Sequence, residues 1–400
     1  MNNVGSFLGW VFKRFNKSFR NFISLLIRLI HPVEKGRVVC WAYNFKQYSC
    51  NPRYLSEYLL EHYPKDFDIY WIVRRKVKIS GFDKRIKFVR FRSWKYHLVV
   101  NTAEFLITNS RTDPYEIFWA KRPMQKYLML WHGGVALKKI EKDAGKKLGF
   151  GYIQKAKIDS KIADLMISGN RNQSELIRNS FDYHGEILEH GYPRNDIFFQ
   201  NEIHKEIKKR VFQDYNIPFN NKIVIYAPTF RRNFSIEPYK LNWSRLVTEF
   251  ENFFNGANVS IFLRLHPNLI NKVNIKSLIN SDAIIDMTLY HDMNELLSIS
   301  DVLITDYSSS MFDFSMLHNP CFLYAPDISE YNKERGTYFD LRTLPFPLSE
   351  SEDELVKSIK NFDQAKYKQD LDVFYNETIG LFEKGKASEN IANWMRKKSM

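Results

Sequence analysis

The chain has 400 residues, which exceeds one typical domain and suffices for two that each bury a core. Its formal net charge of +14, from 59 Lys and Arg against 45 Asp and Glu, indicates an anionic partner: a phosphorylated substrate, an acidic membrane face or a nucleic acid. Aromatic residues make up 16% of the sequence, which excludes a disordered polymer, and the three scattered cysteines indicate neither a disulfide framework nor a zinc cluster.

Residues 1–32 are predicted to form an amphipathic helix that ends at His31-Pro32. Apolar and basic residues alternate between Val4 and Ile30, and no acidic residue occurs there. The basic interruptions are too frequent for the roughly 20 apolar residues of a spanning helix, and no signal-peptide cleavage site follows. We therefore expect a membrane-surface helix whose cations meet anionic lipid on the cytoplasmic side, which makes the protein a peripheral one. A helix packed on the body of the protein or on another subunit is the alternative, so the oligomeric state stays open.

Residues 33–215 alternate apolar strands with helical patterns and are predicted to form a first Rossmann-like domain. Small polar residues end each strand: Asn109 and Ser110 follow one, and His132, Gly133 and Gly134 follow another. In open parallel sheets ligands bind beyond the carboxyl ends of the strands, so these endings are where chemistry is expected. The predicted strands are 38–45, 69–73, 86–91, 105–108, 127–131 and 165–167, with a helix from Asn51 to Leu60.

A second series of the same kind follows Pro218 and is predicted to form a second Rossmann-like domain over residues 216–385. Its predicted strands are 223–226, 259–265, 283–285, 301–304 and 321–324. The polar part from Ser349 to Met400 is predicted to be helical, with residues 386–400 as a basic C-terminal tail.

Residues 301–314 read as a short buried strand that runs directly into a helix. Ser308, Ser309 and Ser310 lie between the two and can cap the helix. A helix N-terminus with free N–H groups and hydroxyls suits a phosphate. An ordinary serine-capped helix that binds nothing is the alternative.

Three strand ends of the second domain would face one crevice. Thr229 precedes Arg231 and Arg232, Arg264 precedes His266, and the third end carries Asp306 with the serines. A single arginine is usually a solvated surface charge, but Arg264 lies inside an apolar strand, where an unpaired charge is costly. Guanidinium, imidazole, hydroxyl and a helix N-terminus together predict a pyrophosphate site.

His132 is the candidate base of the first domain. It sits in a tight turn where Gly133 and Gly134 would let a substrate approach the backbone closely, and a histidine there can remove a proton from an attacking hydroxyl near neutral pH. A lone histidine is more often structural. Nucleotide fingerprints such as Gly-x-x-x-x-Gly-Lys-Ser are missing from the sequence, and the aspartate pairs at 66/68 and 370/372 read as surface features, so no metal or cofactor is predicted.

Five short motifs occur in order between about Asn51 and Asp340, and as a set they resemble the CDP-glycerol glycerophosphotransferase family of teichoic-acid and capsule enzymes. The motifs are Trp131-His132-Gly133, Ala227-Pro228-Thr229-Phe230-Arg231, Arg264-Leu265-His266-Pro267, Thr305-Asp306-Tyr307-Ser308-Ser309 with Phe312-Asp313, and Glu334-Arg335-Gly336. The resemblance implies a GT-B fold of two Rossmann-like domains facing a cleft, with a CDP-alcohol donor on the C-terminal one. It also implies a lipid-linked acceptor at the inner leaflet, in agreement with the N-terminal helix.

The resemblance makes His132 the base on the acceptor hydroxyl and His266 its partner near the donor pyrophosphate. The expected donor-side residues are Thr229, Arg231, Arg264, Asp306, Ser308, Ser309 and Glu334, and the acceptor-side residues are Gly133, Gly134 and Asn109. Of the donor-side set, Arg264, Asp306, Ser308 and Ser309 would hold the phosphate, the ribose or the loop that does. The family often has Thr-Pro after His-Gly where this chain has Gly134-Val135, so the acceptor contacts of that turn differ.

The expected reaction is attack by an acceptor hydroxyl on the β-phosphorus of a CDP-alcohol such as CDP-glycerol, which transfers an alcohol phosphate and releases CMP. A GT-B glycosyltransferase that uses a nucleotide sugar is the competing interpretation. A membrane-tethered nucleic-acid-binding protein is a remote one, because the basic residues are dispersed and no RNA-binding signature occurs. The sequence does not distinguish glycerol from ribitol or a larger alcohol in the donor, nor a primase from a polymerase.

Overall fold

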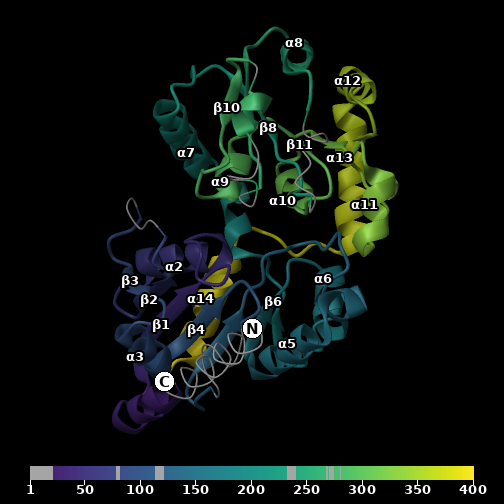
Figure 1. Cartoon of the computed structure of the whole chain (residues 1–400). Helices are drawn as coiled ribbons and strands as arrows, with labels where there is room; N and C mark the ends of the chain where they lie inside the picture. Colours follow the sequence, from purple (N-terminus) through teal and green to yellow (C-terminus); the bar gives the residue numbers. More distant parts are fainter. Residues whose placement is uncertain are drawn as a thin grey trace, which may run out of the picture.

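The computed structural model describes residues 21–77, 82–112, 121–231, 240–266, 269, 274–279 and 281–400. These residues form two bodies, one above the other in Figure 1, each built on a sheet. The first sheet has seven strands in the order β3-β2-β1-β4-β5-β6-β7, and the second has six in the order β10-β9-β8-β11-β12-β13. The pairs that join neighbouring strands are parallel. This architecture confirms the predicted α/β class with two Rossmann-like sheets.

The first body contains every strand that the sequence predicts between residues 38 and 167, and one more. Its elements are β1 (Glu34–Trp41), α2 (Cys50–His62), β2 (Asp68–Val73), β3 (Lys87–Arg90), α3 (Trp94–Thr102), β4 (Ala103–Thr108), β5 (Lys126–Met129), η1 (Glu141–Leu148), α5 (Phe150–Ile162), β6 (Leu165–Ile167), α6 (Arg171–Asn179), β7 (Glu186–Leu188) and η2 (Pro193–Phe199). The extra strand β7 is a three-residue edge strand without a buried residue, so its apolar signal is weak.

The second body contains the predicted strands and a further two-residue strand, β13. Its elements are α7 (Asn201–Asp214), β8 (Lys222–Tyr226), α8 (Trp243–Phe253), β9 (Val259–Leu263), η5 (Ile275–Leu278), β10 (Ile284–Asp286), α9 (Met293–Ser298), β11 (Val302–Thr305), α10 (Ser310–Phe314), η6 (Ser315–Leu317), β12 (Cys321–Tyr324), α11 (Ile328–Arg335), η7 (Leu341–Thr343), β13 (Leu348–Ser349), α12 (Glu352–Lys360), α13 (Gln364–Val373) and η8 (Phe374–Ile379). The prediction assigned residues to 215 to the first domain, but Ile207, Val211 and Phe212 of α7 lie in the core of the second body.

Both sheets are covered on both faces. Along β8, Ile223 and Ile225 belong to one apolar core, whereas Val224 and Tyr226 belong to another on the opposite face. Successive residues of a strand point to opposite faces, so a strand between two helix layers is apolar throughout. This explains why the strands read as continuous apolar runs in the sequence.

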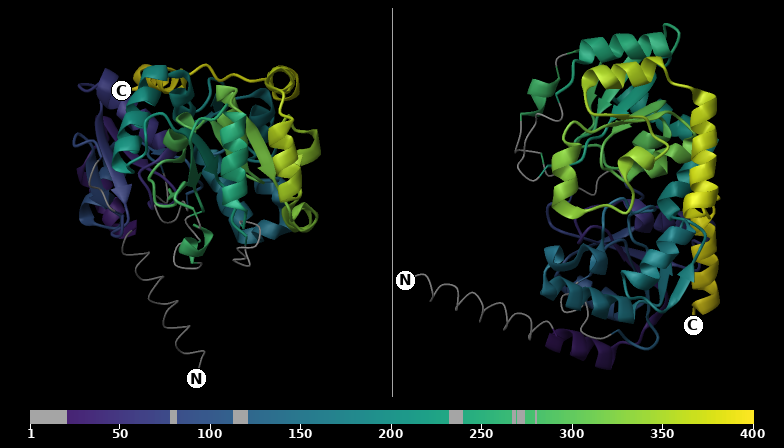
Figure 2. Two further views of the ribbon diagram at one scale, coloured as in Figure 1. Left: turned by 90° about the horizontal axis from the view of Figure 1, so that it is seen from above. Right: turned by 90° about the vertical axis from the view of Figure 1, so that its right-hand side faces the viewer.

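The C-terminal segment returns from the second body to the first as helix α14 (Ala387–Lys398). Figure 2 shows this yellow helix lying along the first body, near the chain's C-terminus. Ile391, Trp394 and Met395 join the same apolar core as Leu55 and Leu59 of α2. Residues 386–400 were expected to be a basic tail, but only the last turn of this packed helix is basic.

Residues 21–30 form a helix against the first body, and residues 1–20 of the predicted amphipathic helix lie outside the described residues. Ile27 is buried, and Arg28 Nε donates to Asn101 Oδ1 at 2.6 Å. Its outer face exposes large apolar side chains, namely Phe22, Leu25, Leu26, Leu29 and Ile30. Among the described helices, none has the length and apolar character needed to cross a bilayer.

Candidate active site between the two bodies

His132 follows strand β5 in the turn predicted for it, and its ring is fixed. Its Nδ1 lies 2.8 Å from the carbonyl oxygen of Asn109. A carbonyl oxygen can only accept, so Nδ1 carries the proton and Nε2 carries the lone pair. Burial lowers the pKa of His132 to about 4, with a further contribution from the nearby Arg194 charge. The imidazole is therefore neutral at physiological pH, with the nitrogen that a general base needs.

The glycine turn after His132 packs on protein. Gly134 is buried beside Tyr192, and its carbonyl oxygen accepts a 2.9 Å hydrogen bond from Asn170 Nδ2. A side chain at Gly134 would also approach Asp313 of the second body, at 3.4 Å from its Oδ1. Gly133 has only Trp131 nearby. Of the two glycines, Gly133 is thus the one with space for a ligand.

Asn109 lies at the carboxyl end of β4 and contacts the turn that carries His132. Its carbonyl holds His132, and its Oδ1 accepts from the backbone N–H of Tyr43 at 3.0 Å. The ring of Tyr43 meets the His132 ring edge-on, with centroids 5.7 Å apart. Within the described part of the chain, the buried Nδ2 of Asn109 and the buried Oγ of Ser110 have no hydrogen-bond partner. The predicted acceptor-side residue Asn109 and the neighbouring Ser110 thus lie at the base of the His132 turn.

Arg194 of η2 connects the His132 turn to the second body. Its guanidinium donates to the carbonyl oxygen of His132, and its Nη2 lies 2.7 Å from Asp313 Oδ2 in α10. Both charged side chains are buried. Burial raises the pKa of Asp313, although the Arg194 charge acts against the rise. One buried ion pair thus fixes the position of the catalytic turn relative to the helix that follows β11.

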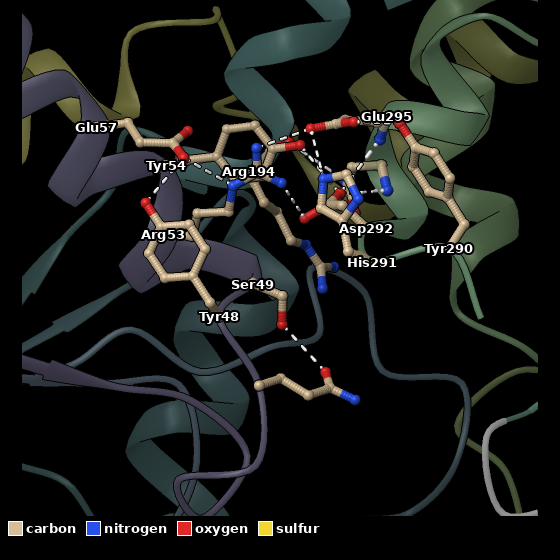
Figure 3. Close-up of polar contacts among 12 residues, drawn as sticks. Tyr48, Ser49, Arg53, Tyr54, Glu57, Arg194, Tyr290, His291, Asp292 and Glu295 are labelled. Atoms are coloured by element: carbon tan, nitrogen blue, oxygen red, sulfur yellow. Dashed lines mark hydrogen bonds and ion pairs between the residues drawn. The ribbon is translucent and has the colours of Figure 1, made fainter. Parts of the chain in front are cut away.

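A second contact between the bodies is the network shown in Figure 3. Arg53 of α2 points at the acidic end of α9, with Nη1 at 3.3 Å from Asp292 and Nη2 at 2.8 Å from Glu295. Tyr54 donates to Asp292 at 3.0 Å. Burial acts to raise the pKa of Glu295, but the hydrogen bond from His291 and the charge of Arg53 hold it well below its usual range.

The loop after the His132 turn also contacts the second body. Lys139 donates its backbone N–H to Gly336 at 3.2 Å, and Tyr338 donates to Leu137 at 2.8 Å. The ammonium of Lys138 lies 5.1 Å from the centre of the Tyr331 ring. Partial desolvation by the neighbouring protein lowers the pKa of His266, although its side chain is accessible to solvent, and the positive charges of Arg264 and Lys138 lower it further. The predicted base of one body and the predicted histidine of the other therefore lie on loops that face each other.

Thr229, Arg231 and Asp306 come together as predicted, but they bond mainly to one another. Asp306 Oδ1 accepts from the backbone N–H of Thr229 at 2.7 Å, and Asp306 Oδ2 lies 2.8 Å from Arg231. Arg231 also pairs with Asp327 at 2.6 Å, beneath the stacked rings of Tyr307 and Tyr331. Arg231 and Asp306 are buried and hold the ends of β8 and β11 together.

The side chain of Arg264 extends from the end of β9 toward the residues that follow the neighbouring strand β10. Its Nη1 donates to the carbonyl oxygens of Met287, at 2.6 Å, and Thr288. Strand β9 ends at Leu263, so Arg264 follows the strand and does not lie inside it as predicted. The backbone acceptors explain how its half-buried charge is tolerated there. The neighbouring His266 is exposed and packs beside Phe230, with ring centroids 5.6 Å apart.

The serine turn is open, but its helix is short. Helix α10 has five residues, and Ser309 at its N-cap makes no capping bond with its side chain. Ser308 Oγ accepts from Ser310 Oγ at 2.8 Å. The expected side-chain cap is therefore wrong for Ser309. Glu334 falls in α11 with its side chain outside the described part, and Arg232 lies outside the described residues.

Sequence reasoning missed the segment Pro193-Arg194-Asn195-Asp196, which is buried at the junction of the bodies. Asn195 Nδ2 donates to Glu383 Oε1 at 3.0 Å, and Asp196 accepts from the backbone N–H groups of Ala387 and Ser388, both at 2.8 Å. The sequence feature that could have indicated this segment is the run of three polar residues, Arg194 to Asp196, after Gly191-Tyr192-Pro193. Recognising β7 would have placed this run at the carboxyl end of a strand, where function is expected.

Two parallel Rossmann-like sheets with facing histidine loops define a transferase fold of the GT-B type. The chain belongs to the CDP-Glycerol:Poly(glycerophosphate) glycerophosphotransferase family, whose model matches residues 23–397. This confirms the family suggested by the sequence motifs.

Similar proteins carry teichoic-acid names. The teichoic acid glycerol-phosphate transferase of Staphylococcus aureus is 33% identical over 369 residues, covering 89% of this chain and 92% of that protein. The teichoic acid poly(glycerol phosphate) polymerase of Bacillus subtilis is 30% identical and aligns with 95% of this chain, which spans about half (51%) of that protein's length. The solved wall teichoic acid polymerase TagF superposes with a TM-score of 0.80 at 30% identity over 99% of this chain and 98% of that one, and a variant of it has been soaked with CDPG.

Proposed function

We propose that this chain transfers glycerol phosphate from CDP-glycerol to a hydroxyl of a lipid-linked acceptor in teichoic-acid or capsule-type synthesis, with release of CMP. The structural observation that carries the proposal is the state of His132. Its Nδ1 proton is committed to the Asn109 carbonyl, its Nε2 is left as a base, and its turn is tied to the other body through Arg194. The names of the similar proteins supply the substrate class.

In the proposed step, the acceptor oxygen forms a bond to the β-phosphorus as the bond from that phosphorus to the bridging oxygen breaks. The acceptor proton passes to His132 Nε2, and CMP leaves with the bridging oxygen. Positioning and charge neutralisation supply most of the catalysis in such phosphoryl transfers.

The donor pyrophosphate is proposed to lie against the loops of the second body. His266, Thr229, Ser308 and Ser309 would contact it, and the exposed His266 imidazole faces the Lys138 charge of the other body. Arg264, Arg231 and Asp306 hold these loops in place through their backbone and ion-pair contacts. The side chain of Glu334 completes the proposed donor set.

We also propose that the helix at residues 21–30 places the enzyme on an anionic membrane, where a lipid-linked acceptor would be found. Leu29 and Ile30 are 74% and 72% exposed, which is costly in water and favourable at a bilayer surface. Sedimentation with vesicles containing anionic lipid tests this, comparing the wild type with Leu29→Ser/Ile30→Ser. Equal binding of the two proteins would contradict the proposal.

The direct test is release of CMP from CDP-glycerol by the purified chain, with a lipid-linked disaccharide or a glycerol-phosphate acceptor analogue. Acceptor-dependent CMP that is lost in His266→Ala would support the donor site. His184→Ala is the matched control, because His184 lies on the surface of the first body with 82% of its side chain exposed. If the protein turned over CDP-ribitol and not CDP-glycerol, the transferred group would be ribitol phosphate. If it released a nucleoside diphosphate from a nucleotide sugar, the protein would be a glycosyltransferase and the proposal would be wrong.

A further inference from the structure

A basic cavity of about 690 Å³ opens on the first body, outside the residues assigned above. It lies at the carboxyl ends of β1, β2 and β3, the same edge of the sheet as His132. Five cations and two apolar residues line it: Lys46, Arg74, Arg75, Lys76, Arg92, Val77 and Phe91. Its volume is in the range of sites that hold ligands of drug size, which is more than a single phosphate needs.

Four of the five cations of this cavity form no ion pair with a carboxylate in the part of the chain that the structure describes. Lys46, Arg75 and Lys76 are exposed, and no ion pair joins them or Arg74 to a carboxylate of the described residues. Arg74 donates from Nε to the carbonyl oxygen of Asn44 at 2.9 Å. Like charges held together repel one another, and an anion that binds among them relieves the repulsion.

The floor of the cavity is aromatic. The Phe91 ring stacks on Phe45 with centroids 4.3 Å apart, and the guanidinium groups of Arg74 and Arg92 lie 5.4 Å and 5.0 Å from its centre. Both arginines are therefore held in place by the aromatic ring before any ligand arrives. Arg92 itself has a φ of +65°, a conformation that a long side chain seldom adopts.

A short strained segment connects the cavity to the proposed base. Tyr43, Asn44 and Phe45 have φ values of +46°, +56° and +68°, and Lys46 follows them at the cavity wall. The Tyr43 ring touches His132. Three residues span at most about 11 Å, so the Cα of Lys46 at the cavity wall lies within that distance of the Cα of Tyr43, whose ring meets His132. Strained backbone persists where surrounding contacts enforce it, and it concentrates at functional sites.

The cavity and the proposed membrane helix are at opposite ends of the first sheet. The helix at residues 21–30 is tied by Arg28 to Asn101, just before the amino end of β4, whereas the cavity is at the carboxyl ends of β1 to β3. Figure 1 shows this helix, in dark purple, at the end of the first body remote from the second. A six-residue strand such as β4 is about 20 Å long. A flat membrane that contacts the helix therefore does not account for the basic cavity.

We infer that the basic cavity binds the phosphodiester groups of a polyanionic acceptor chain and thereby presents its terminal hydroxyl to His132. The inference rests on the proposed function, because it assigns the acceptor of that same active site. It predicts that acceptors with several phosphodiester units bind through the cavity, whereas an acceptor too short to span from His132 to Lys46 does not use it.

The test is the double variant Arg75→Gln/Lys76→Gln, which removes two exposed charges. We expect the KM for a glycerol phosphate oligomer to rise about 3- to 10-fold, as for the loss of two weak surface ion pairs. The KM for CDP-glycerol should stay unchanged, and the effect should shrink with added salt. Lys157→Gln/Lys161→Gln on α5 is the matched control, because it removes the same charge from an exposed face of the same body.

Direct binding separates this inference from the proposed function. Inorganic polyphosphate, titrated by calorimetry, should bind the wild type and the control variant but bind Arg75→Gln/Lys76→Gln several-fold more weakly, whether or not CDP-glycerol is turned over. An active enzyme whose cavity variant keeps the wild-type acceptor KM and polyphosphate affinity would overturn the inference. A variant that loses affinity only for vesicles containing anionic phospholipid would overturn it too, and would assign the cavity to lipid headgroups.

Discussion

At the residue scale, His132 combines two properties that a general base requires. The Asn109 carbonyl selects the tautomer, and burial lowers the pKa to about 4, so that the neutral form prevails at the pH of the cell. A low pKa weakens the base, and that cost is offset in phosphoryl transfer because most of the stabilisation falls on the phosphate oxygens.

His132→Ala should lower kcat about 10²- to 10⁴-fold, the usual cost of losing a general base. In the wild type, the base is active when unprotonated, so kcat/KM should hold across neutral pH and fall as the pH drops through about 4. Steady-state CMP release measured against pH checks both points, with His184→Ala as the reference. An acidic limb centred near 6.5, the ordinary histidine value, would show that His132 is not held neutral by its surroundings.

At the element scale, α14 is a structural part of the first body although it is the last helix of the chain. Trp394 and Met395 are buried against α2, and Asp196 caps the first turn of α14. The C-terminus is held as well, since the backbone N–H of Met400 donates to Glu104 at 2.6 Å. The chain therefore crosses between the bodies twice, at η2 and again before α14.

Met395→Ala should lower the free energy of unfolding by about 2–5 kcal/mol, because it leaves a cavity in the core of the first body. Lys397→Ala, two residues away and exposed, should change it by less than about 0.5 kcal/mol. Urea unfolding followed by tryptophan fluorescence gives both values. If the two variants were equally stable, α14 would be the dispensable basic tail that its composition suggests.

At the scale of the whole molecule, the relative placement of the two bodies depends on buried charges. Arg194 with Asp313, and Arg53 with Asp292 and Glu295, are ion pairs between residues from different bodies. A buried charge whose partner is removed is left uncompensated, so such pairs specify one arrangement strongly even where they add little net stability. The catalytic turn and the donor loops keep their mutual position through these contacts.

Arg53→Met keeps the aliphatic packing but leaves the buried Asp292 without its guanidinium, while Glu295 keeps its contacts with Arg210 and His291. We expect a loss of about 3–5 kcal/mol in the free energy of unfolding. We also expect a lower kcat/KM for CDP-glycerol, because the two bodies would no longer be held in one relative position. Small-angle scattering and urea unfolding measure the two effects. Lys366→Met, which removes one side of the exposed Lys366–Asp370 pair, is the control and should change neither. If Arg53→Met had the same stability and scattering profile as this control, the Arg53 network would not determine how the two bodies are placed.

The sequence by itself determined the elements and the residue types of the site. Apolar runs located the strands from β1 to β6 and from β8 to β12, because a strand covered on both faces must be apolar throughout. Strand ends located His132, His266 and Asp306, because parallel strands bring their carboxyl ends to one edge. These signals are local, and each can be read within about ten residues.

Only the tertiary structure decided which of those residues bond to one another. Arg231 and Asp306 were predicted on the donor side, Asp306 as a residue that holds the donor or the loop around it, and the structure pairs the two with each other between β8 and β11. Arg194 meets Asp313 across a sequence separation of 119 residues, and no local pattern reports such a pairing. Burial of a charge depends on what the rest of the fold places beside it. The candidate residues were therefore predictable from local sequence, whereas the pairing of their charges with one another depended on long-range packing.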